Sequence, residues 1–145
     1  MTKTLAEKRK ETFSRFYEEL MPVLVEFVGQ MGIIPGHAVL KQAAECAPYL
    51  SQALENMVIA EDDKAWLFTR VGYFVGEYFA QKYSGAWYVN EIEGSRYFAR
   101  YVVGKFSRIT NPASMIDPFQ IAEFYVQQPA PRHLVKLLTE VETEL

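Results

Sequence analysis

The sequence predicts an α+β fold that is mostly helical, with five to six helices and a small antiparallel sheet or hairpin around residues 86–109. Two observations carry this prediction. Apolar residues recur at three- and four-residue steps over long stretches, as on one face of a helix. Two short segments rich in aromatic and β-branched residues are separated by a loop, as in a hairpin. The 145 residues contain no repeat and no linker, so we expect a single domain over residues 1–145.

Five helices are expected outside the centre of the chain. The first covers residues 4–31, where an apolar stripe ends at Gly32. Residues 37–60 are expected to hold two shorter helices split near Pro48, because the residue before a proline avoids helical geometry. Asp117 is a good cap for a helix that ends before Pro129, and Pro131 can open the last helix.

The helix expected over residues 63–83 is apolar over most of its circumference, which is typical of a helix at the centre of a core. Gly72 and Gly76 stand four residues apart on it. Each glycine costs about 1 kcal/mol relative to alanine inside a helix. Close approach of another helix or strand to the backbone would explain both glycines.

Strands are expected at residues 86–89 and 97–103, the second running on toward Ile109 through a bulge at Gly104. An isolated hairpin is marginally stable, so it must lie on the helices, gain a third strand or pair with another subunit. Both of its faces carry apolar side chains. The outer face should therefore be covered by the same chain or by a partner, and we expect self-association as a homodimer.

The composition narrows the classes of partner and location. The net charge of −3 provides no basic surface for a nucleic acid. A single cysteine, Cys46, excludes an intrachain disulfide and a cysteine-cluster zinc site. The basic N-terminus lacks the apolar stretch of a secretory signal, and no segment is long and apolar enough to span a membrane. We therefore expect a soluble, cytoplasmic protein that binds neither nucleic acid nor membrane.

No catalytic or cofactor-binding motif is present. His37 and His133 have no partner at metal-ligand spacing, and each is expected near a helix start. Cys46 lies among alanines, which indicates a small buried residue rather than a nucleophile. The phosphate-binding glycine loops and the serine nucleophile elbow are absent. We expect no cofactor, no metal and no catalytic residue.

Glu77 is the only acidic residue between Asp63 and Glu91, in the most apolar part of the chain. Three interpretations remain open. Glu77 lies on a polar stripe and meets water or Arg70; it forms a buried ion pair with Arg96 or Arg100; or it is a functional acid. The first is favoured, because an unpaired buried charge is very costly.

The expected hairpin is dense in aromatic residues, which include Trp87 and Tyr88, with Arg96 and Arg100 among them. Tryptophan, tyrosine and arginine are enriched at binding hot spots. They are also ordinary strand residues, one alternating set of which faces the core. Glu77, Trp87, Tyr88, Arg96 and Arg100 are the candidate binding residues.

The segments Val71-Gly72-Tyr73-Phe74-Val75-Gly76-Glu77-Tyr78-Phe79 and Gly85-Ala86-Trp87-Tyr88-Val89 resemble a pattern of small bacterial proteins of unknown function. In these proteins a Gly-Glu helix leads into a Gly-x-Trp strand, and some are similar to immunity-type proteins that neutralise a toxin by binding it. The resemblance covers roughly residues 67–103. It implies a helix followed by a hairpin, and it assigns no functional residue.

The absence of a catalytic constellation and the two-faced aromatic hairpin favour a non-catalytic protein-binding module, of immunity type or regulatory. The first alternative is a small-molecule binding domain, with a pocket between the hairpin and the 63–83 helix and Glu77, Arg96 or Arg100 as polar anchors. The second is an enzyme with an unrecognised site. A pocket converging on a Glu77 of raised pKa would favour an enzyme, whereas a flat, exposed Trp/Tyr patch would favour protein binding.

Overall fold

The fold is α+β and mostly helical, as predicted. The computed structural model describes residues 2–145. Within that range the helices are α1 (Leu5–Gln30), α2 (Val39–Leu54), α3 (Lys64–Lys82), α4 (Pro118–Gln127) and α5 (Leu134–Glu142). Short 3-10 turns, Gly36–Ala38 and Glu61–Asp63, precede α2 and α3. The strands are β1 (Ala86–Val89), β2 (Tyr101–Gly104) and β3 (Met115–Ile116).

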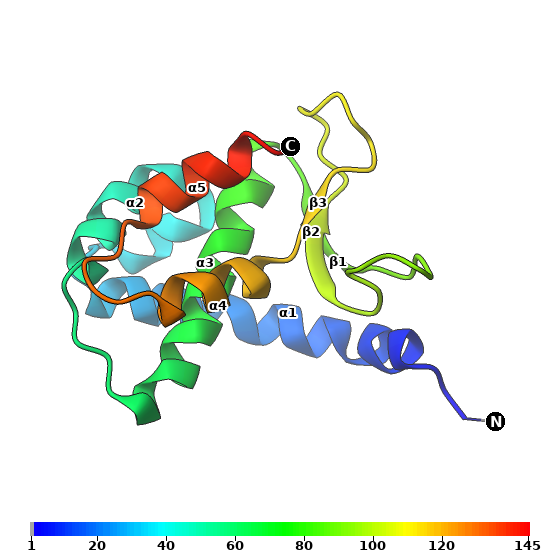
Figure 1. Cartoon of the computed structure of the whole chain (residues 1–145), viewed down its shortest axis with the longest axis horizontal. Helices are drawn as coiled ribbons and strands as arrows, with labels where there is room; N and C mark the ends of the chain where they lie inside the picture. Colours follow the sequence, from blue (N-terminus) through cyan, green and yellow to red (C-terminus); the bar gives the residue numbers. More distant parts are fainter. Residues whose placement is uncertain (1) are drawn as a thin grey trace.

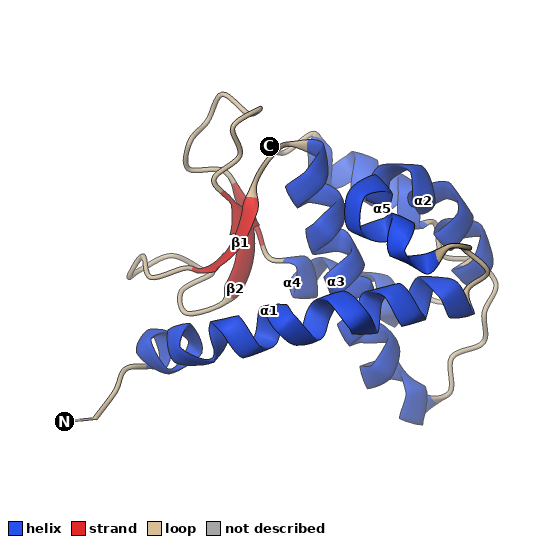
Figure 2. Ribbon diagram, turned by 180° about the vertical axis from the view of Figure 1, so that it is seen from behind, coloured by secondary structure: helices blue, strands red, loops and turns tan. Residues whose placement is uncertain are grey.

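Helix α3 crosses the middle of the molecule, with α2, α4 and α5 around it and the sheet beside its C-terminal half (Figure 1). Helix α1 runs along one side, its N-terminal half beside the sheet and its C-terminal half beside the helices (Figure 2). The strands form an antiparallel sheet in the order β1-β2-β3. Trp87 pairs with Val103, which pairs with Ile116, so a third strand stabilises the hairpin as one of the alternatives predicted.

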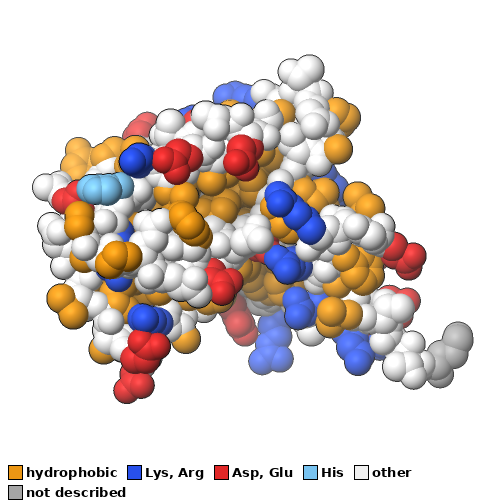
Figure 3. Space-filling view, in the orientation of Figure 1, with side chains coloured by type: hydrophobic (Ala, Val, Ile, Leu, Met, Phe, Trp, Pro, Cys, Tyr) orange, Lys and Arg blue, Asp and Glu red, His pale blue; other side chains and the backbone are white. Residues whose placement is uncertain are grey.

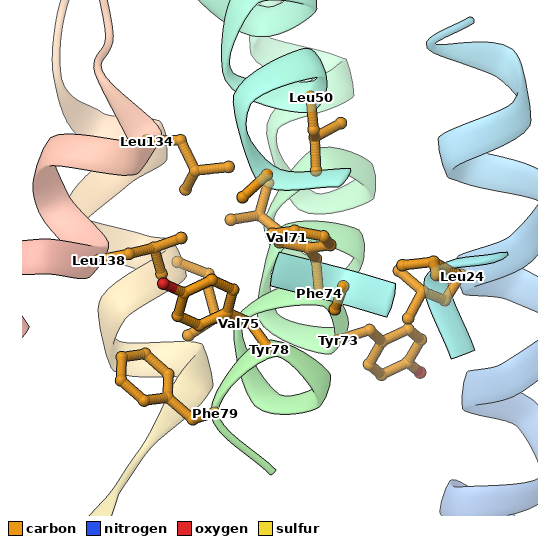
Figure 4. Packing of buried hydrophobic residues seen from close by; sticks show 14 of the residues in the cluster. Leu24, Leu50, Val71, Tyr73, Phe74, Val75, Tyr78, Phe79, Leu134 and Leu138 are labelled. Carbon is orange, nitrogen blue, oxygen red and sulfur yellow. The ribbon is translucent and has the colours of Figure 1, made fainter. Parts of the chain in front are cut away.

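The core is built around α3. Phe74 lies toward α2, Tyr78 and Val75 lie toward Leu134 and Leu138 of α5, and Tyr73 lies beside Leu24 of α1 (Figure 4). Every residue of α3 from Val71 to Phe79 is buried. Full burial of one large apolar side chain contributes about 1.5–3 kcal/mol, so the packing of this one helix is a large contribution to the stability.

The two glycines of α3 are explained by close packing, as predicted. A Cβ atom added to Gly76 would lie 1.8 Å from Cζ2 of Trp87. One added to Gly72 would lie 2.4 Å from Cδ1 of Phe119. Both distances are far below a van der Waals contact, so glycine lets two aromatic rings lie directly on the helix backbone.

The predicted break in α2 is in the wrong place. The helix continues through Pro48, and its non-helical residue is Gln42, with φ −131° and ψ 42°. Ala47, which precedes the proline, is buried against the core, so tertiary packing outweighs the local preference for an extended residue there.

The side chain of Gln81 on α3 stabilises the break at Gln42. Its Nε2 donates to the carbonyl of Val39 at 2.8 Å, and its Oε1 accepts from the amide of Ala43 at 2.9 Å. These are the two backbone groups that a regular α2 would join to each other. The carboxamide of Gln81 is therefore inserted into the hydrogen-bond ladder of another helix.

The second strand is shorter than predicted. Residues 97–100 form a turn, with Ala99 at φ 62°, and the strand ends at Gly104 without running on to Ile109. Backbone bonds from Ala99 and to Arg100 tie this turn to Asn90, at 2.7 and 3.0 Å. The loop is held by local hydrogen bonds that outweigh the strand propensity of its aromatic residues.

Asp117 caps α4, as predicted. Its Oδ1 accepts from the amides of Phe119 and Gln120, at 3.0 and 3.2 Å. Its Oδ2 accepts from Arg100 at 2.8 Å. The capping residue thus fastens the turn before β2 to the start of α4, in addition to stabilising the helix end.

Candidate functional site

Glu77 lies on the C-terminal half of α3 and is buried, with 7% of its surface exposed. The indole Nε1 of Trp87 donates to its Oε1 at 3.1 Å. The Nε2 of Gln81 makes a longer contact of 3.4 Å with its Oε2. Each carboxylate oxygen is therefore held by one neutral donor, and each retains a free acceptor position.

The favoured interpretation of Glu77 is wrong, because the side chain does not lie on a hydrated stripe or meet Arg70. The guanidinium of Arg70 lies over the ring of Trp66, 4.5 Å from its centroid. The predicted ion pair is also wrong: Arg100 pairs with Asp117, and Arg96 lies over the ring of Tyr97. Within residues 2–145, Glu77 has no cationic partner.

The environment changes the acidity of Glu77. Burial raises the pKa of its carboxyl above the usual value, although the hydrogen bonds from Gln81 and Trp87 act in the opposite direction. Burial raises the pKa of the Tyr17 phenol as well, with a smaller contribution from the Glu77 charge. The carboxyl and the phenol are therefore neighbours across the boundary between α1 and α3.

A cleft of about 370 Å³ opens beside this carboxyl and is called here the Glu77 cleft. Segments of α1, α3 and the start of β1 line it, and Figure 2 shows α1 passing both the sheet and α3. Its lining residues are Phe13 and Tyr17 of α1, Glu77, Ala80 and Gln81 of α3, and Gly85, Ala86 and Trp87 at the start of β1.

Local sequence builds the wall formed by Trp87. Ser84 has φ 53°, and the amide of Gly85 bonds to the carbonyl of Ala80 at 2.9 Å, which ends α3 sharply. The chain then turns back, so that Trp87 lies against Gly76. Phe16 of α1 packs edge-on against the indole, with ring centroids 5.4 Å apart. The indole is thus fixed on two sides and by its hydrogen bond to Glu77.

The structure brings two of the predicted binding residues together and separates the other three. Glu77 and Trp87 share the cleft. Tyr88 points to the other face of the sheet, where Nζ of Lys105 lies 4.4 Å from its ring centroid. Arg96 and Arg100 do not line the cleft.

Three side chains of the cleft were not among the predicted site residues. Phe13 and Tyr17 belong to the apolar stripe predicted for residues 4–31, and their contact with the 63–83 helix is a tertiary contact that the sequence does not encode locally. Gln81 had a readable signal. It lies four residues after Glu77, on the same side of the helix, where a neighbour for a buried carboxyl is expected.

The outer face of the sheet is covered by the chain itself. Val102, which pairs with Tyr88, is 0% exposed, and Tyr88 is half-buried. The reason for expecting a homodimer was an uncovered apolar face, and that reason no longer holds. Self-association stays a prediction without this support.

Three other side chains considered in the sequence, Cys46, His37 and His133, lie outside the Glu77 cleft. Cys46 is buried, as predicted, and burial raises the pKa of its thiol. His133 precedes α5 and lies 3.1 Å from Glu55, while His37 belongs to the turn before α2. No group of histidine, cysteine, aspartate and glutamate side chains in residues 2–145 is arranged to hold a metal ion.

A second hollow of about 460 Å³ lies at the opposite end of the helices, between the end of α1 and α2. We call it the Ile34 hollow. Ile34 is 87% exposed and Tyr49 is 68% exposed. Its lining residues are Met31, Gly32, Ile33, Ile34, Tyr49, Gln52 and Ala53. The lining includes no charged side chain.

Comparison of the chain with protein families, with curated proteins and with solved structures finds no match in any of the three. The resemblance to immunity-type proteins therefore stays a prediction. Among the helices of the described residues, none combines the length and the apolar character needed to cross a membrane.

Proposed function

We propose that this protein is a small-molecule binding domain whose ligand occupies the Glu77 cleft, between α1, α3 and the start of β1. The observation that supports the proposal best is a buried carboxylate that lines a cleft and has no cationic partner among residues 2–145. A buried charge is costly unless it is paired, and a ligand group in the cleft would provide the pairing. Aromatic walls around a few fixed polar groups are typical of small-molecule sites.

The cleft converges on a Glu77 of raised pKa, which is the arrangement described above as favouring an enzyme. The other residues of the lining nevertheless favour binding over catalysis. Glu77 is its only carboxyl group, and Tyr17 is the only other titratable side chain in its lining. Nucleophilic catalysis needs a nucleophile that is activated by a neighbouring base, by a lowered pKa or by a metal, and the described lining offers none of these. A carboxylate held by two donors serves better as a fixed anchor than as a proton carrier.

Trp87 offers a direct test, because it is one of two tryptophans in the chain. In a Trp66→Phe background, Trp87 is the only source of tryptophan emission. We expect a chemically mixed library of small molecules to yield compounds that change this emission and raise the melting temperature. Ala80→Met, which fills the cleft, should abolish both effects.

Ala44→Met is the matched control, since Ala44 is exposed on α2 and does not line the cleft. It should leave binding unchanged. The proposal is wrong if no library member binds, or if the compounds that bind are insensitive to Ala80→Met.

Protein binding is the second candidate function, and a different surface favours it from the one predicted. Trp87 and Tyr97 of the hairpin region are 5% and 9% exposed, so they offer little contact area. At the helical end, Ile34 and Val58 are 87% and 93% exposed, and hydrophobic side chains reach the surface there (Figure 3). Exposed apolar groups of this kind are common in protein interfaces.

A tagged protein can be used to capture partners from a native extract, beside an Ile34→Ser, Tyr49→Ser variant and an Ile92→Ser control. A partner lost in the double variant and kept in the control would support a binding role of immunity or regulatory type. Sedimentation at high protein concentration tests the homodimer in the same preparations. Capture that does not depend on the Ile34 hollow would contradict this second candidate.

A further inference from the structure

We infer that the ligand of the Glu77 cleft is an organic cation, a protonated amine attached to an apolar body. The inference rests on the proposed function and names the class of ligand. It follows from three features of the cleft: the sign of its fixed charge, the free acceptor positions of Glu77 and the aromatic composition of its walls.

The first feature is charge. The two donors that hold Glu77 are the indole of Trp87 and the amide of Gln81, and both are neutral. They stabilise an ionised carboxylate without cancelling its charge. An anionic ligand would be repelled by this carboxylate, whereas a cation would replace the solvation that burial removes.

The second feature is the geometry of the free acceptor positions. A carboxylate has about four lone-pair positions, and the two donors occupy one on each oxygen. An ammonium group carries three donors and can bond to both oxygens from the open side of the cleft. Tyr17, on the α1 side, can accept a further bond through its hydroxyl oxygen.

The third feature is the wall. Phe13, Tyr17 and Trp87 supply three aromatic rings to a cleft of about 370 Å³. Phe13 and Tyr17 are partly exposed there, whereas the indole of Trp87 is buried and holds Glu77. The face of an aromatic ring attracts a cation, and its apolar surface also accepts a hydrocarbon body. One cleft therefore satisfies both parts of an amphipathic amine.

The test compares three probes of nearly equal shape: 2-phenylethylammonium, 2-phenylethanol and phenylacetate. Binding is measured by Trp87 emission in the Trp66→Phe protein at about pH 8, where the amine is protonated and Glu77 is more fully ionised than at any lower pH. We expect the ammonium probe to bind at least about tenfold more tightly than the alcohol, and phenylacetate to bind least. Glu77→Gln, which keeps the shape of the side chain, should remove the preference, so that the ammonium probe and the alcohol bind about equally tightly.

A pH series provides a second measurement that needs no variant at Glu77. As the pH is lowered from about pH 8, Glu77 is the only described lining group that can take up a proton, because burial raises the pKa of Tyr17 further above its usual value and its phenol is already protonated. Affinity for the ammonium probe should fall as the pH is lowered toward the pKa of Glu77, while affinity for the alcohol should stay constant.

The inference is overturned if the alcohol or phenylacetate binds as tightly as the ammonium probe, or if none of the three binds. It is also overturned if the preference for the cation survives both Glu77→Gln and low pH. Failure of this inference can be told apart from failure of the proposed function. If neutral compounds bind and Ala80→Met blocks them, the cleft is still the binding site, and only the inference of a cationic ligand is wrong.

Discussion

The Glu77 cleft and the Ile34 hollow are of similar size, about 370 and 460 Å³, yet they differ in almost every other respect. In the Glu77 cleft, each oxygen of the buried carboxylate accepts a hydrogen bond, one from Trp87 and the other from Gln81. The second is lined by side chains that are largely exposed and has no charged group in its lining. One has a fixed polar anchor and the other presents loosely held apolar surface.

The Glu77 cleft and the Ile34 hollow therefore differ in how firmly their lining side chains are held, and not in volume. In the Glu77 cleft the indole of Trp87 is fixed by Gly76, by Phe16 and by Glu77. A side chain held on three sides is pre-organised, so a ligand does not have to order it. Ile34 has no such support, and its rotamers would have to be ordered by any partner that binds it.

Among the substitutions that test this comparison, Gly76→Leu is expected to have the largest effect on stability. The new side chain would occupy the position of the Trp87 ring, so the indole must leave the helix surface or the helix must move. Overpacking of this severity costs about 3 kcal/mol or more, which approaches unfolding for a small domain. Urea denaturation measures the loss.

Gly29→Leu on α1 is the matched substitution for Gly76→Leu, since nothing lies within 4 Å of a Cβ atom at Gly29. It should stabilise the protein by up to about 1 kcal/mol through helix propensity. Equal effects of the two substitutions would show that Trp87 does not depend on Gly76.

A smaller effect is expected from Gln81→Leu. The change leaves the amide of Ala43 without its acceptor, at a cost of about 1–3 kcal/mol. Hydrogen exchange should show faster exchange of the Ala43 amide. The comparison is with Gln52→Leu, because Gln52 lines the Ile34 hollow and should tolerate leucine within about 0.5 kcal/mol.

Glu77→Gln tests the burial of the carboxyl through pH. The folded state holds the proton of Glu77 to a higher pH than the unfolded state, whose pKa lies near 4.5. The folded state therefore binds more protons above that pH, and stability falls as the pH rises through the window up to the folded pKa. We expect the free energy of unfolding of the wild type to decline relative to Glu77→Gln across this window and to stay level above it.

The pH experiment uses urea denaturation of both proteins at each pH, because subtraction removes the contributions of all other groups. A difference that does not change with pH would mean that the carboxyl of Glu77 is hydrated in the folded state.

The smallest effect is expected from Ile34→Ser and Tyr49→Ser. Both side chains are mostly exposed, so each change should alter stability by less than about 0.5 kcal/mol. Trp87 emission should not change. A loss comparable to that of Gln81→Leu would show that the Ile34 hollow is closed in solution and is part of the core.

Where local signals agreed with tertiary packing, the sequence predicted the fold well. The cap at Asp117 and the strand at 86–89 are found as predicted, and α3 is central with close packing at both glycines. The two errors share a cause. At Pro48 the core keeps the helix intact against a local preference, and at residues 97–100 hydrogen bonds to Asn90 replace the strand.

The site was predicted less completely. The sequence identified Glu77 and Trp87 as candidates, and it offered a pocket between hairpin and helix as an alternative. It could not show that they meet, because their contact depends on the turn at Ser84 and on how closely β1 approaches Gly76. The predicted arginine partners of Glu77 were wrong, because neutral hydrogen-bond donors stabilise this buried carboxylate. A search for residues of opposite charge does not detect such donors.

The insertion of Gln81 into α2 has a consequence for the order of folding. The first turn of α2 is broken at Gln42, and the Val39 carbonyl and the Ala43 amide bond to Gln81 of α3 instead of to each other. In an isolated α2 segment these two groups would bond to each other in a regular helical turn, so the broken conformation needs α3. The break at Gln42 therefore forms when α3 docks, and it should be among the last parts of the helical core to form and among the first to be lost.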